Sequence, residues 1–437
     1  MKFFPKSADG FLSAMMMAEN ALLRDFSLSC PASLFGAEPM ESAKKAVKSC
    51  MTLSSFPCAQ MLKTNTRYVH DFAKRTLTVT VNARYMSTGK EVNDLRCVAT
   101  DIAESIKRGL PENTDFFQVI AAYQSWLKRF FVYKKTGATR DHPAVGLLQT
   151  RQGVCQAIAA LSMVILPHLG ILARYVCGEG YSGTDWGPHA WNAVWAPNGT
   201  WHQVDFTFGL HRKTTPNTFT LQDDLSFREL HRWDEVAQSP ALFQNVQTFE
   251  NRLQAKTVLL FANNPFKAEI GGVPMLFDEP VLQNGCVRLL PLLTLLGGGC
   301  ELLEDTLHIV LGGKTYRIPC GMTISNGFVP INEVLAQSGF CTAEQRGGVV
   351  VVKLKPCPPY FFSNLFTFIK VKARSSSLNC SSASKSSRFT RGFSAPALKN
   401  SIGVMPKYSQ IAKNSVIEGS VLPEEILLIY PRLCPRS

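Results

Sequence analysis

One cysteine stands at the start of an apolar, helix-prone stretch of the chain. Gly153 and Val154 precede Cys155, and Gln156 follows it. Residues 157–166 contain no glycine and no charge and are rich in helix formers. The pattern predicts an apolar helix that carries a thiol at its N-terminus. Unpaired N–H groups and the helix dipole at such an end favour the thiolate, which is the reactive form of cysteine.

The segments around this helix predict an α+β fold. Upstream, residues 93–107 have the pattern of one helix, and Asn113 can cap a second, whose apolar stripe extends to Phe130. Downstream, Pro167 should end or kink the cysteine helix. Strands are then predicted at residues 172–177, 189–195 and 200–206, with a glycine-rich exposed loop at 178–188 between the first two. A helix followed by antiparallel strands is typical of α+β proteins.

A turn between the last two strands makes a geometric test possible. His189 and Asp205 are sixteen residues apart, and they share a sheet face only if the connecting loop has an odd number of residues. Residues 197–199 have the sequence Pro-Asn-Gly, which suits a three-residue loop with proline first and glycine in the left-handed region. That register pairs Ala196 with Thr200 and Trp191 with Asp205. His189 then lies diagonally opposite Asp205, within reach of a hydrogen bond.

Cys155, His189 and Asp205 form a coherent set for nucleophilic catalysis. Cys155 would be the nucleophile, His189 the base that removes its proton, and Asp205 the group that orients and stabilises the imidazole. The N–H of Cys155 at the helix start is a natural oxyanion donor, and the sequence does not identify a second. Each residue also has a structural reading. A buried cysteine is usually inert, a histidine can be an ordinary strand residue, and an aspartate can cap a loop.

Three short motifs carry a family resemblance. Gly-Val-Cys-Gln at 153–156, His-Ala-Trp-Asn at 189–192 and Trp-His-Gln-Val-Asp-Phe-Thr at 201–207 resemble the transglutaminase-like superfamily, in its bacterial branch. The approach to the cysteine at 142–148 and the segment 219–231 are similar as well, so the resemblance covers roughly residues 110–235. It implies a papain/transglutaminase-like core, in which the helix bearing the cysteine packs on an antiparallel sheet. The family's catalytic residues fall on Cys155, His189 and Asp205. Phe206 and Phe208 depart from the more common residue types.

The resemblance implies acyl transfer through a cysteine thioester. Such an enzyme would be a transglutaminase-like cross-linker or a cysteine peptidase or amidase, acting on protein or cell-wall peptide. The acceptor, an amine or water, decides between these, and the sequence does not reveal it. The alternative is a catalytically inactive binding or scaffold protein of the cell surface that keeps the fold.

Composition excludes several other functions. The chain of 437 residues can hold two or three domains, and its 13 cysteines include no C-x-x-C pair. No metal or other cofactor is therefore predicted. Residues 358–437 contain eleven Lys/Arg and three Glu, so they supply +8 of the net charge of +13. The basic character belongs to a serine-rich tail that is predicted to be disordered, and no specific nucleic-acid partner is expected.

The second half of the chain has its own pattern. Turn, proline, short helix, glycine and strand pair recur around Pro291 and Pro330, which predicts a small α+β repeat domain. It resembles the copper amine oxidase N-terminal-like domain, a stalk module of bacterial surface proteins. Copper is not implied, because His308 is the one histidine here. The predicted organisation is therefore a region of unclear fold at 1–74, a transglutaminase-like domain at 75–262, the stalk at 263–355 and the tail at 356–437.

The expected compartment follows from the stalk. It predicts a cell-envelope or secreted protein that could contact cell-wall polymer, although the N-terminal segment makes a poor signal peptide because Glu19 interrupts it. The alternative is a cytoplasmic protein. No stretch approaches the roughly 18 consecutive apolar residues of a membrane-spanning helix, so none is predicted.

Overall fold

The computed structural model describes residues 1–51, 61–210, 220–222, 224–233, 257–319, 327–331 and 339–355. The fold is α+β, as predicted. Two larger sheets, of five and nine strands, form its framework, together with smaller sheets. The short helix that the repeat predicts after Pro330, at residues 331–337, and the predicted tail at 356–437 fall almost wholly outside the described residues.

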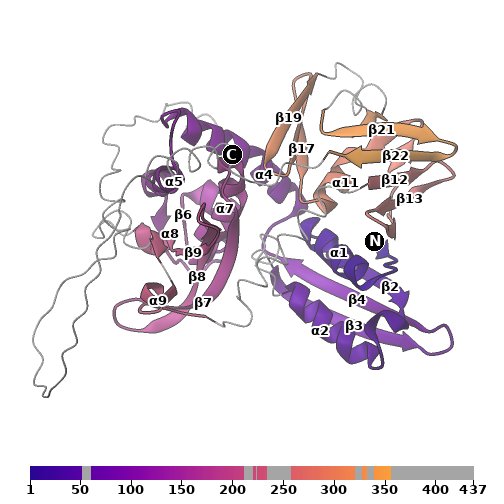
Figure 1. The fold of residues 1–437 in the computed structure, drawn as a ribbon, viewed down its shortest axis with the longest axis horizontal. Coiled ribbons are helices and arrows are strands. Elements are labelled where there is room, and N and C mark those ends of the chain that lie inside the picture. The colour runs from indigo at the N-terminus through magenta and orange to yellow at the C-terminus, as the bar shows by residue number, and fades with distance from the viewer. Residues whose placement is uncertain are drawn as a thin grey trace, which may run out of the picture. The chain divides into compact units, whose positions relative to one another are not determined.

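The five-stranded sheet is antiparallel and lies against the cysteine helix α7 (Cys155–Ile165), as Figure 1 shows. Its strands, in the order β10-β9-β8-β7-β11, are β10 (Thr220–Gln222), β9 (Trp201–Val204), β8 (Trp186–Trp195), β7 (Ala173–Tyr181) and β11 (His231–Arg232). Pro167 does not continue the helix: α7 ends at Ile165 and a 3₁₀ turn, η3 (Leu166–Leu169), follows.

Three helices lie upstream of α7 in the chain: α4 (Gly89–Arg108), α5 (Phe116–Phe130) and α6 (Ala144–Thr150). The first two begin at capping boxes. Thr88 and Glu91 form a capping box at α4. The cap of α5 is Asp115, which exchanges hydrogen bonds with Gln118, so the prediction of Asn113 as the cap was wrong. Asp115 prevails because its carboxylate reaches the third residue of the helix.

The predicted hairpin register is confirmed. Trp195 pairs with Trp201 and Asn192 with Val204, the register that sets Ala196 opposite Thr200. The Ala196 N–H donates to the Thr200 carbonyl at 2.9 Å, and the Gly199 N–H donates to the Ala196 carbonyl at 3.0 Å. Gly199 has φ +78°, the left-handed conformation that the three-residue loop requires.

The predicted loop at 178–188 was wrong. β7 continues to Tyr181 and β8 starts at Trp186, so most of the segment is paired sheet. Gly178 and Gly180 are strand residues whose missing side chains leave room for close neighbours: a Cβ on Gly180 would lie 2.8 Å from Cδ2 of His189. The third predicted strand is also shorter, since β9 ends at Val204 and Asp205 caps the short helix α8 (Phe206–Gly209).

The nine-stranded sheet joins the two ends of the described chain. Its strands, in the order β21-β22-β12-β13-β14-β1-β2-β4-β3, are β21 (Cys341–Arg346), β22 (Val349–Leu354), β12 (Thr257–Phe261), β13 (Asn264–Ile270), β14 (Val273–Leu276), β1 (Lys2–Phe3), β2 (Asp25–Pro31), β4 (Thr76–Tyr85) and β3 (Met61–Asp71). β1 pairs antiparallel with β14 and parallel with β2. Residues from the predicted regions 1–74 and 263–355 thus share one sheet and one apolar core, which includes Phe3, Leu28 and Met275.

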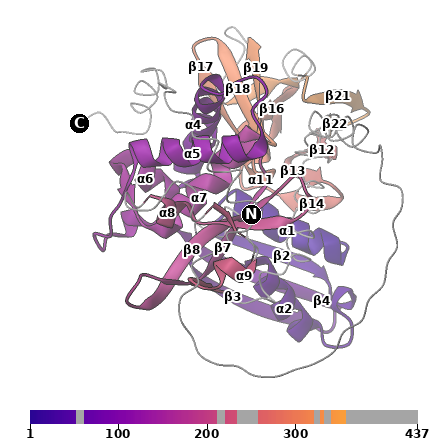
Figure 2. The same ribbon diagram turned by 60° about the vertical axis from the view of Figure 1, so that its left-hand side comes forward.

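Helices α1 (Ala8–Asn20) and α2 (Pro39–Met51) accompany the N-terminal strands, and Figure 2 shows both beside β2, β4 and β3. Helix α1 lies in the N-terminal segment that was described above as a poor signal peptide. Its Phe11, Met15 and Met17 are fully buried.

The remaining elements belong to the predicted repeat. They are β15 (Leu282–Gln283), β16 (Cys286–Arg288), α11 (Leu289–Leu295), β17 (Gly299–Leu303), β18 (Thr306–Leu311), β19 (Lys314–Pro319) and β20 (Phe328–Pro330). The repeat pattern predicts strands at residues 306–311, 314–318 and 348–354. Strands form at all three places, with ends that differ from these ranges by at most one residue. No helix in the described part of the chain is long and apolar enough to span a lipid bilayer.

Candidate active site

Cys155 is the first residue of α7, as predicted. Val154 before it is extended and offers no side-chain cap, and the rest of the helix from residue 157 is buried. The thiol itself is partly exposed. Gly153 pairs with Tyr133 in a short parallel ladder, and a Cβ on Gly153 would lie 3.0 Å from the Asp141 carbonyl oxygen. The approach to the nucleophile position is therefore closely packed, whereas the thiol remains accessible.

His189 and Asp205 meet on one face of the sheet, as the hairpin argument required. The Asp205 carboxylate accepts a hydrogen bond from His189, with 2.7 Å between Nε2 and Oδ2. Cys155 interacts with the same imidazole and contributes to the rise in its pKa. The His189 side chain is 8% exposed and that of Asp205 is fully buried. The structure thus brings all three predicted site residues together, with the partly exposed Cys155 at one end and the buried carboxylate at the other.

The electrostatics of the pair follow from burial and from its hydrogen bonds. Burial alone would lower the pKa of His189. The Asp205 charge and the hydrogen bonds to Asp205 and Cys155 oppose burial and raise this pKa to about 10. Burial would raise the pKa of Asp205, but the His189 charge and the hydrogen bonds from His189 and His231 lower it to about 2. Between these values the pair is an imidazolium facing a carboxylate.

His231 is a fourth member of this cluster, and the sequence analysis assigned it no role. Its Nε2 lies 2.9 Å from the same Oδ2 of Asp205 that faces His189. The other carboxylate oxygen, Oδ1, accepts the backbone N–H of Phe208 at 3.0 Å. The indication of this role in the sequence was weak. His231 is the last residue of the segment 219–231, and that segment resembles the family only in following the strand that carries the aspartate.

Aromatic rings hold the imidazole of His189 on two sides. Phe208 stacks on it with ring centroids 4.8 Å apart, and Trp191 lies at 5.9 Å. Phe206 instead packs edge-on against Tyr123 at 5.0 Å, beneath the site. The two phenylalanines that departed from the common family pattern therefore have clear structural roles.

Asn192 joins the histidine strand to the cysteine helix. Its side-chain amide donates to the carbonyl oxygen of Ala159 in α7 at 3.0 Å and to that of Arg174 in β7 at 3.3 Å. Trp191 donates its indole N–H to Gln203 at 2.9 Å. The motif at 189–192 thus contributes one site residue and two residues that fix the spacing between β8 and its neighbours.

Tyr133 borders the thiol side of the cluster. It is 45% exposed, and the adjacent Val132 is 60% exposed. Burial raises the pKa of Tyr133, and the negative charges of Cys155 and Asp205 raise it further. On the other side, Gln156 and His142 are in hydrogen-bond contact at 3.0 Å. An apolar, partly exposed surface therefore lies next to the nucleophile position.

The group His189, Asp205 and His231 could also hold a metal ion, because one ligand atom from each lies within 4.8 Å of the others. The sequence analysis predicted no metal site. In the described geometry two imidazole nitrogens converge on one carboxylate oxygen at hydrogen-bond distances. Cys155 is not one of these three residues, and it interacts with the group through His189.

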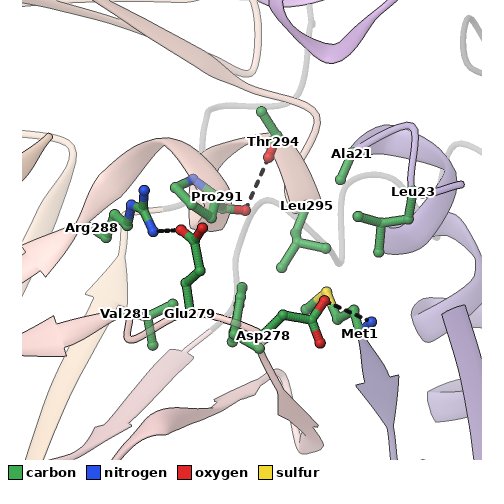
Figure 3. Close-up of a pocket in the computed structure, with 11 residues that line it drawn as sticks. Met1, Ala21, Leu23, Asp278, Glu279, Val281, Arg288, Pro291, Thr294 and Leu295 are labelled. Carbon is green, nitrogen blue, oxygen red and sulfur yellow. Dashed lines mark hydrogen bonds and ion pairs between the residues drawn. The ribbon is translucent and has the colours of Figure 1, made fainter. Parts of the chain in front are cut away.

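A separate cavity of about 290 Å³ lies beside α11 (Figure 3). The amino group of Met1 lies 3.1 Å from Asp278 at its edge, and Arg288 forms an ion pair with Glu279. The lining contains no cysteine or histidine. It therefore offers none of the groups that the predicted chemistry needs.

A family model covers the segment of the chain that contains these residues. Residues 100–206 match the family model described as the transglutaminase-like superfamily. This match spans Cys155, His189 and Asp205. The chain therefore contains a transglutaminase-like domain with an α+β core. No curated protein matches the chain significantly.

Three solved structures are similar over part of their length. A structure described as a TGase has 12% identity and a TM-score of 0.23, covering 47% of this chain and 56% of its own, little more than half. A candidate cysteine protease from Cytophaga hutchinsonii has 14% identity and a TM-score of 0.23, covering 41% and 73%. The periplasmic domain of TgpA from Pseudomonas aeruginosa, bound to ethylmercury, has 21% identity and a TM-score of 0.20, covering 36% and 69%.

Proposed function

We propose that this protein is a cysteine enzyme that transfers acyl groups through a thioester. Cys155 is the nucleophile, His189 the acid and base, and Asp205 the orienting carboxylate. The single observation that supports this most is the 2.7 Å hydrogen bond between His189 and the buried Asp205 carboxylate, made by the imidazole that also interacts with the partly exposed Cys155. A helix start supplies the thiol and a sheet supplies its partners, so rigid elements hold all three.

The chemistry follows from these positions. With His189 present as the imidazolium, Cys155 reacts as the thiolate of an ion pair: its sulfur attacks an amide carbonyl carbon, which forms the C–S bond and moves charge to the carbonyl oxygen. The Cys155 N–H at the start of α7 stabilises that oxygen. The C–N bond then breaks, and the His189 imidazolium gives its proton to the leaving amine. An acceptor attacks the thioester while the neutral His189 removes the acceptor's proton, the C–S bond breaks, and the thiolate–imidazolium pair is restored.

Thiol alkylation tests this proposal against the inactive-scaffold alternative. Cys155 should react quickly with iodoacetamide near neutral pH, because His189 supplies an ion-pair partner for the thiolate. His189→Ala should slow that reaction sharply, as followed by mass spectrometry of the peptide that contains Cys155. Cys177 on β7 is an internal control, and its rate should stay unchanged. Equal rates at Cys155 in both proteins would favour a scaffold that merely keeps the fold.

The acceptor decides between cross-linking and hydrolysis. Incubation with a glutamine-bearing peptide and a labelled primary amine separates the two. Incorporation of the label means transferase activity, and release of ammonia or cleavage without label means an amidase or peptidase. Cys155→Ala is the blank in both cases.

The proposed substrate is protein or cell-wall peptide, and the proposed compartment is the cell envelope or the exterior. Both rest on the resemblance of the second half to a stalk module. Fractionation of cells with detection of the mature protein tests the compartment, and recovery in the cytoplasm alone would contradict it.

A further inference from the structure

His231 enters the site from a strand at the far edge of the sheet. It lies on β11, where it pairs with Gly180 of β7. The ring is 1% exposed and stacks on Phe227, with centroids 3.7 Å apart and planes 14° apart. Trp191 and Phe208 also contact it, at 4.9 Å and 5.1 Å. Packing on several sides therefore fixes the plane of this imidazole.

Both ring nitrogens face oxygen atoms. Nδ1 lies 3.2 Å from the carbonyl oxygen of Phe227, and Nε2 lies 2.9 Å from Oδ2 of Asp205. A carboxylate oxygen only accepts hydrogen bonds, so Nε2 is the donor in the contact with Asp205. The contact with Asp205 is thus a hydrogen bond from an N–H to an ionised, fully buried carboxylate, which belongs to the stronger class of hydrogen bonds.

The carboxylate of Asp205 is held at both oxygens. Phe208 donates to Oδ1, while His189 and His231 both donate to Oδ2. Phe208 holds only Oδ1, so without His231 the direction of Oδ2 would depend on the His189 ring, the group that Asp205 itself has to orient. The donor on His231 is independent of that ring. It can hold Oδ2 in place at every step.

We propose that His231 is a positioning residue of the acyl-transfer site: it fixes the Asp205 carboxylate so that Oδ2 faces His189 throughout the reaction. This inference rests on the proposed function of Cys155, His189 and Asp205. It makes the site a group of four side chains, one of which comes from the segment after α8. The titratable side chains that face the His231 ring are Asp205 and His189. Arg232, next to it on β11, turns away to stack over Trp186.

The test compares two substitutions of His231. His231→Gln keeps an N–H donor at a similar reach, and His231→Leu removes it but keeps an apolar side chain in the packed site. His168→Leu is the matched control, because His168 is also buried and contacts Thr100 at 3.3 Å, away from the cluster. Circular dichroism and thermal unfolding check that each full-length variant is folded.

The first measurement is the rate of Cys155 alkylation as a function of pH. His231→Leu should slow the reaction by about tenfold to a hundredfold at neutral pH, the size expected when a catalytic pair loses its alignment. The acid limb of its profile should move to higher pH, toward that of His189→Ala. His231→Gln should restore most of the rate and the position of the limb, and His168→Leu should match the wild type. A purely structural role would not move the limb or be rescued by glutamine.

Three outcomes would overturn the inference. One is a folded His231→Leu protein with the wild-type profile, and another is a loss in His231→Gln as large as in His231→Leu. The third is a slowing of wild-type alkylation by a chelator that equals the effect of His231→Leu, which would assign the cluster to a metal ion. The proposed function fails separately: in that case His189→Ala itself leaves alkylation unchanged.

Discussion

Gly180 lies against the imidazole of His189, and any side chain at this position would meet the ring: an added Cβ would be 2.8 Å from Cδ2 and 2.9 Å from Cγ. Real Cβ atoms are not found at such distances from other heavy atoms, so one of the two residues would have to move. The glycine lies on β7, in the segment 178–188 that the sequence pattern had predicted to be an exposed loop, and the histidine lies on β8. This close contact makes the sheet, and not a loop, responsible for the direction of the imidazole.

Gly180→Ala should therefore reduce the reactivity of Cys155. The added methyl group displaces the His189 ring from Asp205, and a displacement of about 1 Å lowers a rate by about a hundredfold. The rate of alkylation by iodoacetamide measures the effect. Gly187→Ala is the matched control, because Gly187 lies opposite Gly180 on β8 and has open space around its Cβ position. Equal losses in both variants would show that the sheet, not the ring contact, is responsible.

The pKa of His189 should depend on Asp205. In the wild type the ring should titrate near pH 10, well above its ordinary value of 6.5. In Asp205→Asn the charge is gone while burial remains, so the pKa should fall to 6.5 or below. NMR titration of the ring carbon-bound protons measures both values. His168, whose pKa is lowered by burial to about 4, should titrate identically in the two proteins. A His189 pKa that ignores the substitution would contradict the ion pair.

Asp205 should also stabilise the fold in a pH-dependent way. Its pKa in the folded state is about 2, below the ordinary 3.8, so its contribution is present above about pH 4 and is lost as the pH falls toward 2. At neutral pH, Asp205→Asn should lower the free energy of unfolding by about 3–5 kcal/mol, the range for breaking a buried ion pair. The difference from the wild type should shrink on acidification. Urea unfolding at several pH values measures it, and a difference that stays constant down to pH 2 would refute the linkage.

His189 contributes with the opposite sign. Its pKa is raised on folding, so its stabilisation is complete below about pH 6.5 and is lost as the pH rises through about 10. His189→Gln should therefore differ most from the wild type between about pH 4 and pH 6.5, where Asp205 is still ionised, and least above pH 10. The same urea series, extended to alkaline pH, provides the measurement.

Asn192→Ala should loosen the connection between β8 and α7. The substitution leaves the carbonyl oxygens of Ala159 and Arg174 without this donor inside the core. Buried groups that lose a partner destabilise a protein by about 1–3 kcal/mol each. Thermal unfolding should show the loss, together with slower alkylation of Cys155. Asn65→Ala, on the exposed face of β3, is the control and should change neither property.

The sequence by itself determined the local parts of the site. Residues 197–199 have the chemistry of a three-residue turn, and that turn sets the register of the two strands that carry His189 and Asp205. The apolar run after Cys155 likewise determined where its helix begins. These features are readable because turn geometry and helix periodicity depend on residues that are close in the chain.

Tertiary structure decided what joins distant segments. His231 reaches Asp205 only because β11 pairs with β7, and β1 joins β14 across more than half of the chain. Gly180 belongs to a strand only because the His189 ring fills the space beside it. The identity of a distant partner strand cannot be read from the alternation of residues within either strand. The free energy of strand pairing comes from burial and backbone hydrogen bonds, which many partner strands could supply. The sequence therefore contains three members of the site in readable form, and the folded sheet adds the fourth.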